Sequence, residues 1–159
     1  MLKCRYDNDY IFHADPPPDF RFGYSVDALN TWFDQLGYDG CRSVYLKFAI
    51  VDLFPFMQTY VVLLAAPMIW VARTSGKSTK LALIFVQVMM FDVVETCIPA
   101  YGCHIYPERL PPPVILVAST ANRLKWTSAA IGFAMIVALY FETRRAETKA
   151  RQGDHDKSL

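Results

Sequence analysis

Five polar or charged residues interrupt stretches of the sequence that are otherwise apolar. Asp92 and Glu95 are three positions apart and share a helix face, and Asn122 and Lys125 repeat that spacing further along the chain. Asp52 lies in an earlier apolar stretch. Counted from the corresponding end of each expected helix, at about 1.5 Å per residue, all these groups fall in one layer about 9–18 Å deep. Carboxylates, an amide and an ammonium at one depth can pair with one another, line a cavity or transfer protons.

The sequence leaves the role of this polar cluster open between structural and functional alternatives. In a structural role, Lys125 would neutralise Glu95 or Asp52, and Asn122 would join helices through hydrogen bonds. A site for a small amphipathic ligand would instead require an apolar pocket with Asp52, Glu95 and Lys125 at its wall. Catalysis would require, in addition, a carboxylate that has no cation partner.

The apolar stretches lack the residue types and spacings that are typical of enzymes. The three histidines, His13, His104 and His155, lie outside them, so carboxylates alone would have to carry protons. Gly76-Lys77-Ser78 lacks the upstream glycine of a phosphate-binding loop. No Cys and His spacing is typical of a metal site, so we expect neither a metal nor another cofactor. We therefore favour a non-enzymatic protein, with a membrane-embedded enzyme that uses its carboxylates as the alternative.

The distribution of apolar residues predicts an all-α integral membrane protein. Hydrophobic residues make up 53% of the 159 residues, and the formal net charge of +1 gives no bulk attraction to nucleic acid. Segments of about 41–72, 79–101 and 113–142 are each long enough to cross the hydrocarbon layer. A soluble chain of this length with three such helices would keep almost no polar surface. The expected partners are the lipid bilayer and, in the structural alternative, other membrane subunits.

The segments outside the three spans have distinct characters. Residues 25–37 carry apolar side chains at spacings of three and four, which predicts an amphipathic helix. That helix either lies in the membrane interface or packs on the other helices as ordinary core. Residues 1–24, with three consecutive prolines, predict an extended arm, and residues 144–159 form a polar, basic tail. The membrane domain therefore covers residues 25–143.

Basic residues predict the orientation of the chain in the membrane. The turn from Arg73 to Lys80 contains three basic residues and no acid, and the tail contains four basic residues near its start. With three spans both lie on one side, which the positive-inside rule makes cytoplasmic. The amino terminus and the loop Gly102–Pro113 then face the lumen or the exterior. A break near Arg123 would give four spans, but it would move the positive tail outside, so we favour three.

The cysteines lie on the non-cytoplasmic side of this expected topology. Cys4, Cys41, Cys97 and Cys103 all fall near that side, and none lies in the basic turn or the tail. An oxidising compartment permits disulfides, and Cys41 with Cys103 is the pair best placed to form one. The other interpretation, that all four are unrelated free thiols, is slightly favoured.

Several short motifs together resemble a family of small multi-span membrane proteins of unknown activity. They are Phe22-Gly23-Tyr24-Ser25, Gly40-x-Arg42-x-x-Tyr45, Asp52-Leu53-Phe54-Pro55, Phe91-Asp92-x-x-Glu95 and Ala118-Ser119-x-x-Asn122-x-x-Lys125-Trp126. The pattern covers about residues 20–140. This resemblance implies a compact helical membrane bundle, but it supplies no activity, substrate or cofactor.

A looser likeness is to the membrane fold of sterol isomerases and sigma-type receptors. It implies acidic side chains in the spans around a sterol or another lipid-like ligand. This chain departs from that fold because its spans lack histidine and because it has three clear spans rather than four. The likeness supports only the alternative of an enzyme or a sterol/lipid-ligand receptor.

Overall fold

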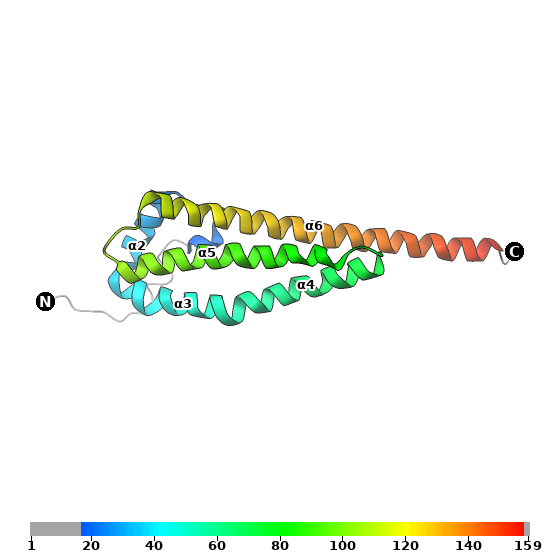
Figure 1. Ribbon diagram of the computed structural model, residues 1–159, viewed down its shortest axis with the longest axis horizontal. Helices are drawn as coiled ribbons and strands as arrows, with labels where there is room; N and C mark the ends of the chain where they lie inside the picture. The colour runs from blue at the N-terminus through cyan, green and yellow to red at the C-terminus, as the bar shows by residue number, and fades with distance from the viewer. Residues whose placement is uncertain (1–16, 158–159) are drawn as a thin grey trace.

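The computed structural model describes residues 17–157, apart from some side chains such as those of Asp19 and Arg42, and this part of the chain contains helices and no strand. Three long helical segments lie side by side, and a shorter helix crosses one end (Figure 1). This arrangement confirms the predicted all-α bundle of three spans and one amino-terminal helix. In chain order the elements are η1 Pro18–Phe20, α2 Val26–Gly40, η2 Cys41–Tyr45, α3 Leu46–Val51, η3 Asp52–Phe56, α4 Met57–Thr74, η4 Thr79–Ala82, α5 Leu83–Ile105 and α6 Pro112–Lys157.

Three segments are long and apolar enough to cross a membrane: Ser43–Thr74, Thr79–Ile105 and Pro112–Ala146. They match the predicted spans and make this chain a multi-pass membrane protein by length and composition. The third span does not break near Arg123, so the four-span alternative is not adopted. Their outer faces carry large exposed apolar side chains, such as Leu63 and Phe133, which suits contact with lipid.

The first span contains a wide helical turn that directs an acidic side chain inward. Pro55 lies in the π-helical segment η3, where the backbone N–H of Met57 donates to the carbonyl of Asp52, five residues earlier. Proline has no N–H to donate, and a wider turn accommodates this gap without ending the helix. Asp52 is only 8% exposed, whereas Val51 and Phe54 beside it are 57% and 64% exposed. The segment therefore points its one carboxylate toward the other helices.

Helix α2 belongs to the core of the bundle. Ser25 caps it, because its hydroxyl accepts a hydrogen bond from the N–H of Ala28 at 3.1 Å. Leu29, Trp32 and Phe33 are buried. Their cluster also contains side chains from the first span and from the ends of α5 and α6. Of the two roles that its amphipathic pattern allows, the structure thus shows packing on the other helices.

The expected end of this helix at residue 37 coincides with a kink. Gly37 has a φ of 64°, a left-handed conformation that favours glycine, and the chain resumes its helix directly afterwards. Helix α2 is therefore longer than predicted, ending at Gly40, and it leads into the first span through η2 without a loop.

A second apolar cluster lies nearer the other end of the bundle. It includes Met68 and Val71 from α4 and Phe85 from α5. Gly132 on α6 lets Phe85 approach, because a Cβ at this glycine would lie only 2.7 Å from the ring. Helices α5 and α6 make the most extensive contact in the molecule. The polar residues of the spans lie between the two apolar clusters.

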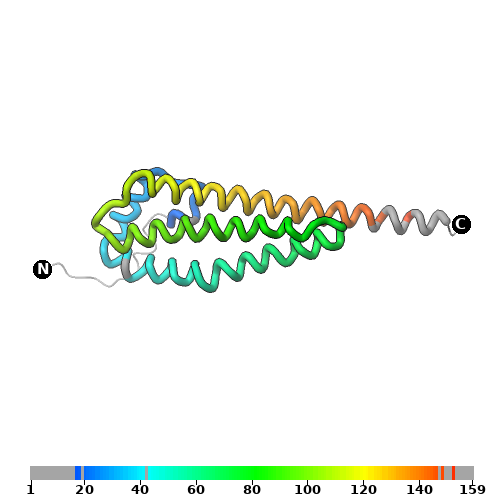
Figure 2. The backbone as a smooth tube through the Cα atoms, viewed as in Figure 1, coloured from blue at the N-terminus to red at the C-terminus, as the bar shows by residue number. Residues whose placement is uncertain are grey.

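The two flanking segments differ from the sequence-based expectation. The described part of the arm begins with the short 3-10 turn η1 rather than a continuous polyproline stretch, because the carbonyls of Pro17 and Pro18 accept backbone hydrogen bonds. Helix α6 continues through the basic tail to Lys157, and it extends past the turn that joins the first two spans (Figure 2). His104 lies in the last turn of α5 and not outside it. Residues 1–16, including Cys4 and His13, lie outside the described residues.

Candidate functional site

Lys125 is the centre of the buried charged group. Its ammonium nitrogen lies 2.9 Å from Oδ1 of Asp92 and 3.0 Å from Oε2 of Glu95, and all three side chains are buried. The two carboxylates reach one cation because their spacing of three residues places them on the same face of α5. Lys125 meets them from the facing side of α6. The structure therefore brings together three of the five polar residues that the sequence singled out.

Asp52 belongs to the same group but is not ion-paired with a described side chain. Its Oδ2 accepts a hydrogen bond from the hydroxyl of Thr96 at 3.1 Å. Glu95 has one oxygen on Lys125, while its other oxygen, Oε1, is buried without a hydrogen-bond partner among the described residues. Two carboxylates thus share one ammonium and a third lies nearby without a cation, so the group carries excess negative charge when all three are ionised.

Two further side chains complete the group and were missed by the sequence reading. Thr96 binds Asp52, and its place four residues after Asp92 could have indicated that role. Tyr60 donates from its hydroxyl to Oδ2 of Asp92 at 2.5 Å. Tyr60 follows Asp52 by eight residues, so in an ideal α-helix the two side chains would point about 80° apart around the helix axis. The wider π turn between them takes up one extra residue and removes most of this angle, so both side chains point to the same side. No local sequence signal shows that turn.

Asn122 has a different role from the one expected for it. Its side-chain oxygen accepts from the N–H of Gly23 at 3.1 Å, and its side-chain nitrogen donates to the carbonyl of Pro18 at 3.3 Å. Ser119 accepts from the N–H of Tyr24 at 2.9 Å. Asn122 is one helical turn from Lys125, about 5 Å along α6, and this offset places its amide at the level of the arm. It anchors residues 17–24 instead of joining the charges.

An apolar cavity of about 470 Å³ lies beside the charged group. Asp52, Asp92 and Lys125 form the charged part of its wall. Glu95, which we expected at such a wall, is not among the lining residues, and Asp92 takes that place. Phe20 of the arm contributes to the wall as well. The apolar part of the lining includes Phe48, Phe56, Leu64, Val88, Trp126 and Ala129.

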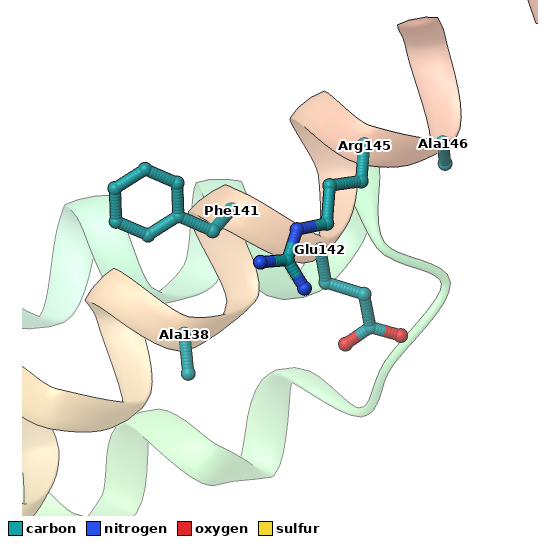
Figure 3. A pocket seen from close by; sticks show the side chains of 5 residues that line it. All are labelled: Ala138, Phe141, Glu142, Arg145 and Ala146. Atoms are coloured by element: carbon teal, nitrogen blue, oxygen red, sulfur yellow. The ribbon is translucent and has the colours of Figure 1, made fainter. Parts of the chain in front are cut away.

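A second hollow, of about 590 Å³, lies on the part of α6 that extends toward the carboxyl end (Figure 3). It is lined by Ala138, Phe141, Glu142, Arg145 and Ala146. All five belong to a single helix, so this hollow is an open stretch of surface rather than an enclosed site. The cavity beside Lys125 is smaller, but residues from all three spans surround it, which is the arrangement that a ligand site requires.

Cys41 and Cys103 lie together in the apolar cluster under α2. Both are completely buried. Cys97 is exposed on another face of α5. The two thiols are free in this structure, so the expected disulfide stays a prediction. Among the described residues, no group of three His, Cys, Asp or Glu side chains is arranged to hold a metal ion.

The fold and the site define a class: a multi-pass helical membrane protein with a buried charge cluster that borders an apolar cavity. Comparisons with protein-family models, with curated proteins and with solved structures find no match to this chain. The site therefore has to be interpreted from its own geometry.

We predict that Lys125→Met lowers the stability of the detergent-purified protein by about 3–5 kcal/mol, because two buried carboxylates would lose the cation that pairs with both of them among the described residues. Adding Glu95→Gln should recover part of this loss, since it removes one of the unpaired charges. Thermal unfolding followed by circular dichroism measures both effects. Lys47→Met, at an exposed position of α3, is the matched control and should change little. Equal stability of Lys125→Met and Lys47→Met would contradict the central role of Lys125.

We also predict a disulfide between Cys41 and Cys103 in protein isolated from its native membrane without reductant. After unfolding and treatment with a maleimide, mass spectrometry should find Cys97 modified and the other two modified only after reduction. In a Cys41→Ala variant, Cys103 should become reactive without reduction. If Cys41 and Cys103 of the unreduced wild type react as fully as Cys97, the prediction is wrong.

Proposed function

We propose that this membrane protein binds a small amphipathic ligand in the cavity beside Lys125. One observation carries the proposal: an apolar cavity of about 470 Å³ has three charged side chains, Asp52, Asp92 and Lys125, on its wall. Ligand sites in proteins are typically about 300–1,000 Å³, mostly apolar, with a few polar groups that orient the ligand. A purely structural cluster would need full pairing and would gain nothing from an adjacent void, because voids cost packing energy.

The cavity wall has an order that suits an amphipathic molecule. Val88 is four residues from Asp92, and Ala129 is four residues from Lys125, each one turn toward the basic turn at 73–80. Leu64 is one turn beyond Tyr60 in the same direction. One helical turn is about 5.4 Å, so a layer of apolar side chains adjoins the charged layer on that side. A polar head at the charges would leave its tail against these three residues.

The second candidate is a membrane-embedded enzyme that uses its span carboxylates. Asp52 favours it, because this carboxylate lines the cavity without a cation partner among the described side chains. Such a group could accept or donate a proton. Chemical analysis of the bound molecule after its release distinguishes binding from catalysis. A binding protein releases its ligand unchanged, whereas an enzyme converts it into a product.

The proposed orientation places α2 and the loop between α5 and α6 at the lumenal or extracellular side. The charges support it, because the basic turn after α4 lies at the opposite end, where Lys77 pairs with Glu142 of α6 at 3.3 Å. Positive segments stay cytoplasmic. The motif resemblance to small multi-span membrane proteins likewise stays a proposal, and it adds only the expectation of a compact bundle.

For the orientation, we predict that an impermeant maleimide labels Glu108→Cys in intact cells and labels Gln152→Cys only after permeabilisation. Glu108, between α5 and α6, and Gln152, near the end of α6, are exposed. These two segments lie at opposite ends of the molecule (Figure 1). The unmodified chain measures the labelling background of its own cysteines. Labelling of Gln152→Cys in intact cells, with none at Glu108→Cys, would show that the orientation is reversed.

For the cavity, we predict that Ala129→Phe abolishes ligand binding and keeps the fold. Ala129 lines the cavity, so a phenyl ring at this position would fill it, whereas Ala130→Phe places the same ring on an exposed face of α6. Organic extracts of both variants and the wild type, purified in the same detergent, are compared by mass spectrometry. A small amphiphile at near-stoichiometric amount should accompany the wild type and Ala130→Phe only. Identical extracts from all three proteins, with unfolding temperatures showing them folded, would contradict the proposal.

A further inference from the structure

We infer that the ligand carries a cationic head group, a protonated or quaternary amine, that binds against Asp52. This inference rests on the proposed function, because it specifies the chemistry of a ligand for the same cavity. It is carried by the balance of charge at the cavity wall and by the kind of side chain that surrounds it.

The charges at the wall leave one negative group uncompensated. Lys125 already contacts both Asp92 and Glu95, at 2.9 Å and 3.0 Å. Asp52 receives only the neutral hydroxyl of Thr96 among the described residues, and that bond occupies one of its two oxygens. A buried carboxylate is costly without a cation or several hydrogen bonds. An ammonium in the cavity would supply the missing charge beside the carboxylate that has no cation.

The side chains around the cavity are those that bind organic cations. Phe48, Phe56 and Trp126 all line it, together with Tyr60 and Phe20. The negative face of an aromatic ring attracts a cation within about 6 Å of its centre, and this attraction grows when water is excluded. Trp126 already makes such a contact, because the nitrogen of Lys125 lies 5.4 Å from its ring centre. A second cation would find aromatic rings and a carboxylate in the lining of one cavity.

Neither an anionic nor a neutral head group fits this wall as well. An anionic head group would need Lys125 as its counter-charge, but that ammonium is already shared by two carboxylates. The carboxylate of Asp52 would also repel the anion. A neutral head group would accept or donate hydrogen bonds while leaving the charge of Asp52 unbalanced. The apolar layer formed by Leu64, Val88 and Ala129 suits an alkyl or ring system attached to the cation.

The experiment compares three probes that share one tail: decyltrimethylammonium, decanol and decanoate. Their binding to purified protein in nonionic maltoside micelles is measured by equilibrium dialysis, and binding to empty micelles is subtracted. For the wild type, the cation should bind at least about tenfold more tightly than decanol, because leaving a buried charge without a partner typically costs more than one tenfold step in affinity. Decanoate should bind most weakly.

Variants then assign this preference to one side chain. Asp52→Asn keeps the size of the residue and removes its charge, so it should reduce cation binding to the level of decanol and leave decanol binding unchanged. Asp39→Asn removes an exposed acid outside the cavity and should leave all three affinities unchanged. If Asp52→Asn does not fold, the relative affinities of the three probes for the wild type still test whether the site prefers a cationic head group.

The possible failures are distinguishable. If decanol or decanoate binds as tightly as the cation, and Ala129→Phe abolishes that binding, the cavity is a ligand site and the cationic head group is wrong. If the cation is preferred equally by the wild type and Asp52→Asn, the assignment to Asp52 is wrong. If no probe binds the wild type better than Ala129→Phe, the inference fails together with the proposed function.

Discussion

The contact of Lys125 with two carboxylates is the interaction on which the centre of this bundle depends. Charged groups are expensive at membrane depth, and they usually pair with an opposite charge or face a cavity. Asp92 and Glu95 come from α5 and Lys125 from α6, so the pairing fixes how these two helices are rotated toward each other. The apolar clusters on either side of the layer fill the remaining interface, and Gly132 permits the close approach at one of them. Charge therefore sets the register of the two helices, and packing supplies the contact area.

The first span is the irregular member of the bundle, and the cavity lies along it. Its two π-helical segments change the rotation of the helix, and the second of them turns Asp52 inward. Small or medium side chains on the other spans, such as Val88 and Ala129, leave room for the cavity, and aromatic side chains make up much of the rest of its lining. A regular helix that presented Phe54 in place of Asp52 would put an apolar ring against this space and leave the charge facing lipid.

Much of this arrangement could be predicted from the sequence. Apolar length gave the three spans, and a uniform rise per residue correctly placed Asp92, Glu95 and Lys125 at one depth. The contribution of Tyr60 could not be predicted, because it depends on a π turn that has no local signal. The role of Asn122 could not be predicted because its partners are backbone atoms of the arm, and nearly every residue type has the same backbone atoms. The cavity depends on side-chain volumes from several helices at once, and periodicity within a single helix does not reveal it.

The way the arm is attached has a consequence for how this protein can change during evolution. Ser119 and Asn122 bind only main-chain atoms of the arm, namely two N–H groups and a carbonyl. Almost any residue offers those atoms, so these hydrogen bonds place little constraint on an exposed side chain such as that of Phe22. Gly23 is constrained, because its φ is +78° and the side chain of Arg123 lies against it, and Tyr24 is constrained because it is buried in the apolar cluster under α2. Selection on this attachment therefore acts on α6, one glycine and one buried ring, while Phe20, an exposed residue that lines the cavity, can vary to suit a different ligand.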